Sequence, residues 1–504
     1  MRCFALGLAC ALALLPGVSA SAQETALRIG LSEDPDLLDP TLGSSYVGRI
    51  VFAGLCDKLF DISPKLEIVP QLATGYEYTD PTHLLIHLRQ GVKFHDGEPV
   101  DAEAVRFTLT RDLEAKGSMR RSEISSIASI DVLDPLTVRL NLKAPDAPLL
   151  AQLADRSGIV LPPKAVQQAG DRFGLHPVCS GPFSFVERVP QDRIVLQRFP
   201  GYWNASAIHF DRVVYLPNPN PSVRLANLRA GALDLVEYIV PTDIPTVRRD
   251  SRLKLAIGES LFYQGTTFNL GNGPQADTPA GRSALVRRAF ELSLDRSAIV
   301  QVVYDGLYTP VAQANSPNSP YYVPSIQPPA RDVAKAKALL AEAGVKPPVP
   351  ISLIVANSAD AQQVGEVMQA MAGEAGFAVK ITAIEFASSL QAAYAGRFEA
   401  LNIGWSGRID PDGNMYQFLH TSGTFNYGHY SNPEMDRLLD EERRTSDAGQ
   451  RKALLARIWE VERQDLPLIY LFNPKNSVGM KKSLEGFVQV PDGIIRLQGM
   501  RFGP

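Results

Sequence analysis

Residues 83–105 read HLLIHLRQGVKFHDGEPVDAEAV, and this stretch passes from a strand pattern through a turn into a helix. Leu84, Ile86 and Leu88 occupy every second position, which is the period of a half-buried strand. A Gly-Glu-Pro turn follows. Asp101 is then placed to cap a helix whose apolar residues recur at four-residue spacing. A strand and a helix in such close succession predict a mixed α/β fold.

The same alternation of strand and helix signals continues along the chain. A second strand pattern covers residues 137–143 and follows the turn residues Asp134 and Pro135. Residues 315–329 contain five prolines, which predict an extended loop. Further helix starts are marked by residues that favour the N-cap position, at Asp332, Asn432 and Asp447. No long polar or repetitive linker separates these elements, so we expect them to pack together.

Composition restricts the class of protein. The chain has 504 residues, of which 45% are hydrophobic and 21% are charged. This composition can support a large core and, at roughly 100–200 residues per domain, about three structural units. Lys and Arg number 50 against 54 Asp and Glu, which gives a net charge of −4. Because no strong basic field is available, we expect no DNA or RNA partner.

The amino terminus has the pattern of an export signal. Arg2 precedes an apolar run from Phe4 to Leu15, and small residues follow up to Ala22. The apolar run is shorter than the roughly 20 residues that span a bilayer. We therefore predict a signal peptide over residues 1–22 rather than a membrane anchor. Charged residues interrupt every later hydrophobic stretch, so we expect the mature chain to be soluble.

Two cysteines, Cys56 and Cys179, remain after removal of this segment. Export places them in a compartment where oxidation is permitted. A bridge between them would close a loop of 123 residues, which the chain-entropy model values at about 4–5 kcal/mol. The sequence leaves open whether they form a disulfide or remain two buried thiols, because it does not fix the distance between their Cα atoms.

Signatures of catalysis are missing from the sequence. It contains neither a Gly-x-x-x-x-Gly-Lys phosphate loop nor a Gly-x-Ser-x-Gly nucleophile elbow. His83 and His87 lie four residues apart, but they sit in a strand pattern with no third ligand nearby, so we expect no metal site there. We also expect no cofactor and no enzymatic activity.

The stretch LRQGVKFHDG at 88–97, followed by VDAEAV at 100–105, resembles the signature of the peptide/nickel family of ABC-importer solute-binding proteins, also called family 5. The resemblance continues in order along nearly the whole mature chain. It is carried by IVPQLA (68–73), SGPF (180–183), FPGYW (199–203), LANLRAGALDL (225–235), RRAFELSLDR (287–296), the helix at 334–344, the segment 405–412 and YSNPEMD (430–436). It agrees with the export signal, the missing catalytic motifs and the α/β pattern.

The resemblance implies a two-lobed periplasmic-binding-protein fold, type II-like, with an extra subdomain in the first lobe. Lobe I would cover residues 23–262, with 61–179 as the inserted subdomain, and lobe II would cover 263–470. Residues 471–504 would return to lobe I. Hinge crossings are expected near 265–269 and 471–474. The lobes would close on a solute by hinge motion, which is a shift of population toward the closed state.

The implied function is that of the periplasmic substrate-binding subunit of an ABC transporter that imports peptides or peptide-like organic solutes. The expected partners are such a ligand and the permease subunits in the inner membrane, with the chain itself a monomer. A secreted hydrolase is one alternative, but it needs a nucleophile and base that the sequence does not display. A ligand sensor that presents its closed form to a receptor is another, and it differs from a transport protein only by its partner.

Candidate ligand-binding residues follow from matching positions. Ser44, Ser45 and Tyr46 lie in a segment that resembles the early loop lining one wall of the cleft, or they form an ordinary serine-rich turn. Arg156 is similar to a position whose side chain approaches the cleft, or it is a solvated surface arginine. Trp405 resembles the aromatic residue at the pocket floor, or it is a core tryptophan.

Arg408 departs from the pattern of the family. In peptide-binding members the third residue after this tryptophan is often an aspartate that holds the α-amino group of the ligand. Asp410 or Asp412 can take over the acidic role, although Asp410-Pro-Asp-Gly413 also has the composition of a plain turn. A desolvated guanidinium needs a carboxylate, which these aspartates, the other lobe or the solute can supply. If the solute supplies it, the solute is anionic or lacks a free α-amino group there.

Overall fold

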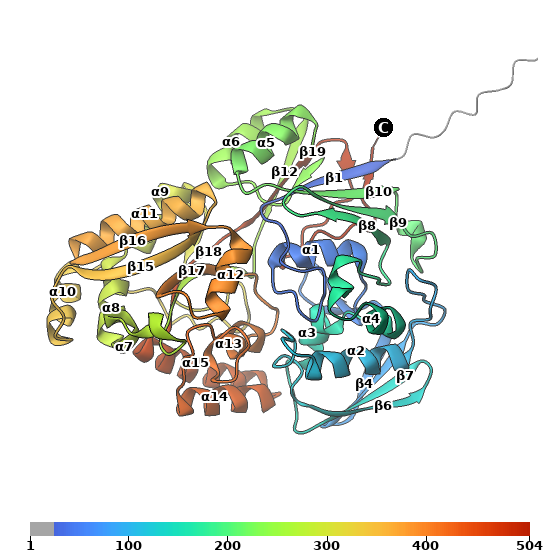
Figure 1. The fold of residues 1–504 in the computed structure, drawn as a ribbon, viewed down its shortest axis with the longest axis horizontal. Helices are drawn as coiled ribbons and strands as arrows, with labels where there is room; N and C mark the ends of the chain where they lie inside the picture. Colours follow the sequence, from blue (N-terminus) through green and yellow to red (C-terminus); the bar gives the residue numbers. More distant parts are fainter. Residues whose placement is uncertain (1–24, 504) are drawn as a thin grey trace, which may run out of the picture.

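The computed structural model describes residues 25–503 and shows two lobes side by side, each built around its own β-sheet (Figure 1). Lobe I contains the N-terminal half of the chain and its C-terminal end, and lobe II contains most of the remainder. The predicted signal peptide, residues 1–22, lies outside the described residues. None of the helices within residues 25–503 combines the length and the apolar character that crossing a membrane requires.

Lobe I is built around a seven-stranded mixed sheet. Strand β1 lies in its middle and runs parallel to both β10 and β11. Leu27, Ile29 and Leu31 of β1 are fully buried in the main core of this lobe. The strands follow one another across the sheet in the order β12 (Leu253–Gly258), β19 (Asn476–Lys481), β11 (Leu235–Val236), β1 (Ala26–Leu31), β10 (Arg212–Pro217), β9 (Arg193–Arg198) and β8 (Phe183–Val189).

A smaller four-stranded antiparallel sheet extends lobe I at the lower right of Figure 1. The expected strand at 83–88 is β5, and its residues Leu84, Ile86 and Leu88 are buried. Asp101 caps the next helix, α2 (Ala102–Glu114), by accepting a hydrogen bond from the backbone N–H of Ala104 at 2.9 Å. The strand order is β4 (Ala73–Asp80), β5 (His83–Leu88), β7 (Thr137–Leu142) and β6 (Ile127–Asp134). Two short pairs complete the strands, β2 (Phe60–Ile62) with β3 (Ile68–Pro70) and β20 (Leu484–Glu485) with β21 (Arg501–Phe502).

Lobe II is built around a six-stranded mixed sheet. Strand β15 runs parallel to β16 and to β17, and its alternate residues Ile351, Leu353 and Val355 are buried in the core of the lobe. The strand order is β14 (Thr309–Pro310), β18 (Leu468–Asn473), β13 (Tyr263–Phe268), β17 (Ala400–Trp405), β15 (Val349–Ala356) and β16 (Phe377–Ile384).

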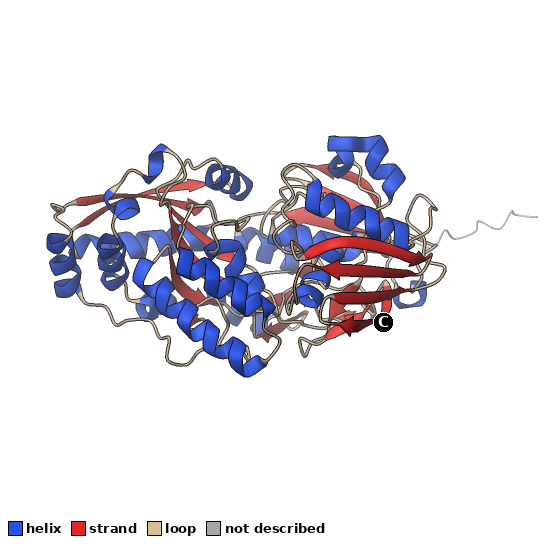
Figure 2. Ribbon diagram, turned by 90° about the horizontal axis from the view of Figure 1, so that it is seen from below, coloured by secondary structure: helices blue, strands red, loops and turns tan. Residues whose placement is uncertain are grey.

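Helices pack around the sheets of both lobes (Figure 2). Besides α2, lobe I contains α1 (Tyr46–Leu55), α3 (Leu149–Leu153), α4 (Pro163–Ala169), α5 (Pro221–Ala230) and α6 (Ile244–Arg249). Lobe II contains α7 (Pro279–Arg282), α8 (Ala284–Ser293), α9 (Arg296–Tyr304), α10 (Val333–Glu342), α11 (Ala359–Glu374), α12 (Phe386–Tyr394), α13 (Asp412–Leu419), α14 (Pro433–Arg444) and α15 (Ala448–Asp465). Asp332, Asn432 and Asp447 accept backbone hydrogen bonds at the starts of α10, α14 and α15, as their residue types predict.

Two short segments join the lobes. The chain leaves the sheet of lobe I after Gly258 and enters the sheet of lobe II at Tyr263. It returns between Asn473, the end of β18, and Asn476, the start of β19. The first crossing was expected at 265–269. It lies earlier in the chain, because residues 263–268 are already paired with β17 as strand β13.

Cys56 and Cys179 form a disulfide with a Cα–Cα distance of 4.9 Å. Cys56 follows the last residue of α1, and Cys179 lies shortly before β8. Both cysteines are buried in the core of lobe I. The bridge therefore ties the first helix of this lobe to the segment that enters the edge of its main sheet.

Candidate functional site

A cavity of about 260 Å³ lies between the two lobes, and residues of both lobes line it. Many of them lie at or just after the carboxyl ends of strands β1, β10 and β11 in lobe I and of β15 and β17 in lobe II. Within each sheet these strands are parallel to β1 or to β15. Their carboxyl ends therefore meet at the same edge, which is where α/β sheets place their ligands.

Aromatic side chains form much of the cavity wall. They come from both lobes and present flat apolar faces, and several add a phenol hydroxyl that can hydrogen-bond a solute. They are Tyr46, Tyr238, Phe262, Tyr263, Tyr304, Tyr308, Phe386, Trp405, Phe418, Phe425, Tyr427 and Phe472.

Ionisable side chains stand between these rings. The lining includes the carboxylates of Glu33, Glu237 and Asp360 and the cations of Arg224 and Lys475. Asp360 accepts a hydrogen bond from the Tyr238 hydroxyl at 3.2 Å. Lys475 forms an ion pair with Glu259, which does not line the cavity.

Glu33 has an unusual environment for a carboxylate. Burial raises its pKa from an ordinary value of 4.5 to about 8, and the nearby charges of Glu237 and Glu385 raise it further, against the opposing effect of Arg224. Within residues 25–503, no side chain or backbone group forms a hydrogen bond or ion pair with the Glu33 carboxylate. The cavity thus contains an acid with unfilled acceptor positions.

Three of the candidate residues line the cavity: Ser44, Tyr46 and Trp405. The Ser44 hydroxyl donates to Asp36 at 2.8 Å, and the Tyr46 hydroxyl donates to the backbone carbonyl of Gly493 at 2.7 Å. Both side chains are therefore held in place from lobe I before any solute arrives.

Trp405 is the last residue of β17 and is held from lobe II. Its indole N–H donates to the Gly413 carbonyl and to the Asn414 side chain, each at 3.1 Å. Its ring packs against Phe418 and Phe425, with centroids 5.0 and 5.1 Å away. Trp405 thus belongs to the core of lobe II and to the cavity wall at once.

Ser45 and Arg156 do not line the cavity but hold its wall in place. The Ser45 hydroxyl accepts from the backbone N–H of Gly48 and caps α1. The buried Arg156 donates to the carbonyls of Gly43 at 3.1 Å and Ser45 at 3.4 Å. These contacts fix the loop that presents Ser44 and Tyr46.

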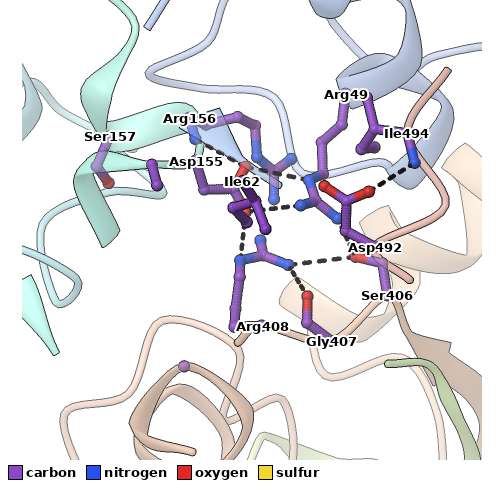
Figure 3. Close-up of polar contacts among 12 residues, drawn as sticks. Arg49, Ile62, Asp155, Arg156, Ser157, Ser406, Gly407, Arg408, Asp492 and Ile494 are labelled. Atoms are coloured by element: carbon purple, nitrogen blue, oxygen red, sulfur yellow. Dashed lines mark hydrogen bonds and ion pairs between the residues drawn. The ribbon is translucent and has the colours of Figure 1, made fainter. Parts of the chain in front are cut away.

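Arg408 also lies outside the cavity lining, in an ion pair between the lobes that we call the Asp155 bridge (Figure 3). Asp155 of lobe I pairs with Arg408 of lobe II and, at 3.0 Å, with Arg49 of lobe I. Arg49 also donates to the Ser406 hydroxyl at 3.1 Å, which is a second contact between the lobes. The charge of Arg408 is therefore met by a carboxylate of the other lobe.

The electrostatics of the Asp155 bridge are those of a buried, matched pair. Burial alone would raise the pKa of Asp155, but the charges of Arg408 and then Arg49 hold it well below its ordinary value. Burial lowers the pKa of Arg408 to about 10, and Asp155 opposes that change. Both groups thus remain charged near neutral pH, and the guanidinium lies 4.3 Å from the centroid of the Trp405 ring.

Asp410 and Asp412 are structural in this arrangement and do not line the cavity. Both oxygens of Asp410 accept from Arg451, at 2.7 and 2.9 Å. Asp412 accepts from Arg443 in the same two-pronged way, at 2.7 and 2.8 Å. Their charges hold the start of α13 to helices α14 and α15.

Sequence reasoning missed the acids that do line the cavity. Ser32, beside Glu33, donates its backbone N–H to Glu237 at 2.8 Å across 205 positions of sequence. A usable signal was present, since Glu33 follows a clear strand at 26–31 and strand ends often carry binding residues. The partner strand β11 spans only Leu235–Val236 and gives almost no periodic signal of its own.

These features define a class of protein. Two α/β lobes are joined by two short crossings, and a cavity lies between them with walls from both, which is the architecture of a binding protein that closes around a solute. In the described part of the chain, no group of three or more His, Cys, Asp and Glu side chains is arranged to hold a metal ion.

Residues 67–426 match the family described as bacterial extracellular solute-binding proteins, family 5 Middle, and the chain belongs to this family. The glutathione-binding protein GsiB of Pectobacterium atrosepticum is 27% identical over 475 residues, which is 92% of this chain and 91% of the relative. GsiB of Salmonella paratyphi A is 28% identical over 502 residues, which is 97% of this chain and 96% of the relative.

Solved structures share the two-lobed fold. The binding protein AgaA from A. tumefaciens R10, in complex with agropinic acid, has a TM-score of 0.87 and 25% identity, and the match covers 95% of this chain and 99% of that one. The dipeptide-binding protein of Pseudoalteromonas sp. SM9913, in complex with Met-Leu, has a TM-score of 0.86 and 23% identity, with 95% and 100% covered. The expected fold class, a two-lobed periplasmic-binding-protein fold, is confirmed.

Proposed function

We propose that this chain is the periplasmic substrate-binding subunit of an ABC importer and that it binds short peptides or peptide-like organic solutes. The observation that carries the proposal is the cavity between the lobes, with walls from both. A solute that contacts both lobes at once stabilises the closed form by its differential affinity for it. The names of the relatives, a glutathione-binding protein among them, support a peptide-like solute.

The size of the cavity favours a small solute. Its volume of about 260 Å³ is just below the range of roughly 300–1,000 Å³ that small-molecule sites occupy. The aromatic rings suit the apolar or planar parts of such a solute, and the few charged groups fix its orientation. A dipeptide or a small amino-acid conjugate fits this description better than a long peptide.

The expected partner and location belong to the same proposal. The closed form would be presented to permease subunits in the inner membrane, and the chain would act as a monomer in the periplasm. Membership of an extracellular family and the export pattern at residues 1–22 support this location. Residues 23–262 with 471–504 would move as lobe I, including the subdomain at 61–179, against 263–470 as lobe II.

We infer that the chain binds its solute without converting it. Among the described residues, the cavity lining includes no histidine and no cysteine, the residues that most often act as base or nucleophile. Mass spectrometry of a bound solute after prolonged incubation should show the unchanged compound. A hydrolysed product in stoichiometric excess over the protein would favour the secreted hydrolase instead.

Filling the cavity tests the proposal. Ala361 is half-buried on the first turn of α11 and lines the cavity, so Ala361→Trp places an indole in the space for the solute. Ala359→Trp is the matched control, because Ala359 is exposed on the same helix and does not line the cavity.

Thermal unfolding and calorimetry with glutathione and a panel of dipeptides give the readout. We expect at least one of them to bind the wild-type chain and the control, and the affinity of Ala361→Trp to fall by at least about tenfold. Equal affinity of all three proteins would show that the cavity is not the binding site.

A further inference from the structure

The wall that lobe I provides to the cavity carries two neighbouring acids, Glu33 and Glu237, beside the cations of Arg224 and Lys475. Glu33 and Glu237 follow the adjacent parallel strands β1 and β11, so their side chains emerge at the same edge of the sheet. The backbone N–H next to Glu33 donates to Glu237 at 2.8 Å, which places the two acids side by side. Like charges held this close in a partly desolvated site repel each other unless a cation lies between them.

Glu237 has capacity for a further hydrogen bond. It is only 7% exposed, and one of its oxygens, Oε1, accepts the backbone N–H of Ser32. Its other oxygen, Oε2, forms no hydrogen bond or ion pair with any residue in the range 25–503. This oxygen is an acceptor position at the cavity wall that a donor group of a solute can fill.

The two cations of the lining do not fill that position, since Lys475 pairs with Glu259 and Arg224 has other partners. Arg224 lines the same wall, but it directs its hydrogen bonds to the backbone carbonyls of Asn218, at 2.6 Å, and Tyr238, at 3.4 Å. It forms no hydrogen bond to either glutamate within the described chain. Arg224 therefore reduces the negative potential of the wall without filling the acceptor positions of Glu33 and Glu237.

A third acid, from the other lobe, adds to the repulsion in this structure. Glu385 caps α12 in lobe II, and its charge acts on Glu33 across the boundary between the lobes. The raised pKa of Glu33, caused first by burial and then by Glu237 and Glu385, is consistent with this crowding. An empty cavity therefore opposes closure at this wall, whereas the Asp155 bridge favours it elsewhere between the lobes.

We propose that the cavity selects solutes with a positively charged group, an ammonium or a guanidinium, and seats that group between Glu33 and Glu237. Such a group offers several N–H donors and forms charge-assisted bonds with carboxylates. It also converts the repulsion on closing into attraction, so the same contact gives both affinity and closure. This assignment rests on the proposed function and names the class of solute within it.

Matched pairs of solutes test the assignment. Each pair is a dipeptide and its acetylated form, which has the same length but one cation fewer: Ala-Ala with N-acetyl-Ala-Ala, and Ala-Lys with Ala-(Nε-acetyl-Lys). For a dipeptide that binds the wild-type chain in calorimetry, acetylation of one of its amines should weaken binding by at least about tenfold. If Ala-Ala binds and N-acetyl-Ala-Ala, which has no free amine, binds within twofold of it, the assignment is overturned.

Isosteric variants connect the effect to the two acids. Glu33→Gln and Glu237→Gln keep the shape of the side chain and remove its charge. Each should weaken the binding of the dipeptide with a free amine by at least about tenfold, and the affinity for its acetylated form should stay nearly unchanged. Glu98→Gln is the matched control, because Glu98 is a half-buried acid that does not line the cavity and is paired with Lys164. If the dipeptide with a free amine binds the two variants as tightly as it binds the control, the assignment is overturned.

A measurement without solute separates this inference from the proposed function. At about pH 9, where Glu33 is ionised, the double variant Glu33→Gln/Glu237→Gln should show a smaller radius of gyration in solution scattering than the wild type, because closing no longer crowds charges. Equal radii would overturn the charge argument. If no dipeptide or glutathione binds while the radii differ, the proposed solute class fails although the crowded acids are real.

Discussion

Replacing Arg408 by alanine removes the cation that lobe II contributes to the Asp155 bridge. The two side chains are 4% and 5% exposed, so the pair is shielded from water. Removing one partner of such a pair costs about 2–5 kcal/mol. Asp155 keeps Arg49 at 3.0 Å, so we expect the lower end of this range, about 2 kcal/mol. At about 1.4 kcal/mol per factor of ten, this corresponds to roughly a 30-fold change in equilibrium constant.

The loss should fall on the closed form, because the bridge joins the lobes rather than holding either one together. Calorimetry with Ala-Lys and with its C-terminal amide measures this loss as a fall in affinity. We expect Arg408→Ala to weaken the binding of both peptides by the same factor and to leave the melting temperature of the solute-free protein nearly unchanged. Arg193→Ala is the control, since Arg193 pairs with Glu187 on the surface and such exposed pairs contribute less than about 1 kcal/mol.

Two results would refute this reasoning. If Arg408→Ala weakens the binding of Ala-Lys but not that of its C-terminal amide, Arg408 binds an anionic group of the solute, which the sequence alone allows. If affinity stays unchanged while the melting temperature falls strongly, Arg408 stabilises lobe II alone. A double-mutant cycle with Asp155→Asn tests whether the loss of affinity comes from the Asp155 bridge. If it does, the effects of the two substitutions on affinity are coupled and do not add.

Two further predictions concern the disulfide and the response to pH. Denatured, non-reduced mature protein should show no free thiol, since Cys56 and Cys179 are bridged; titration of two thiols per chain would contradict the bridge. In this structure burial and the charges of Glu237, Glu385 and Asp36 raise the pKa of Glu33 from 4.5 to about 8, against Arg224, and opening the lobes should relieve the burial. The closed form then holds an extra proton between these values, so closing is favoured at low pH and this contribution is lost as the pH rises through about 8. The radius of gyration of the solute-free wild type should increase between about pH 6 and about pH 9, whereas that of Glu33→Gln should change less; identical profiles would exclude Glu33 as the cause.

Local signals in the sequence predicted much of the fold. Asp101, Asp332 and Asp447 were expected as helix caps from residue type and the pattern that follows, and all three accept the capping hydrogen bond. These signals work because a cap depends on atoms within three residues of chain. The alternation at 83–88 likewise predicted β5, whose buried face follows from period two alone.

The candidate site was less predictable, because its key contacts depend on packing between distant segments. Arg408 was singled out as a charge in need of a partner, but its partner, Asp155, comes from the other lobe and is unrelated by any local spacing. Asp410 was a candidate for the cavity, but Arg451 on α15 takes up both of its oxygens. A sequence shows which charges need partners, and the tertiary fold decides which partner each one meets.

The most direct test of the central claim is the solute that the protein retains. The wild-type chain, Ala361→Trp and Ala359→Trp are purified from the native host without denaturation and then unfolded, and small molecules released are identified and counted by mass spectrometry. The cavity between the lobes predicts one small organic solute, unchanged and near one per chain, from the wild type and Ala359→Trp, and little from Ala361→Trp. Equal release of the same solute from all three proteins would contradict binding in that cavity.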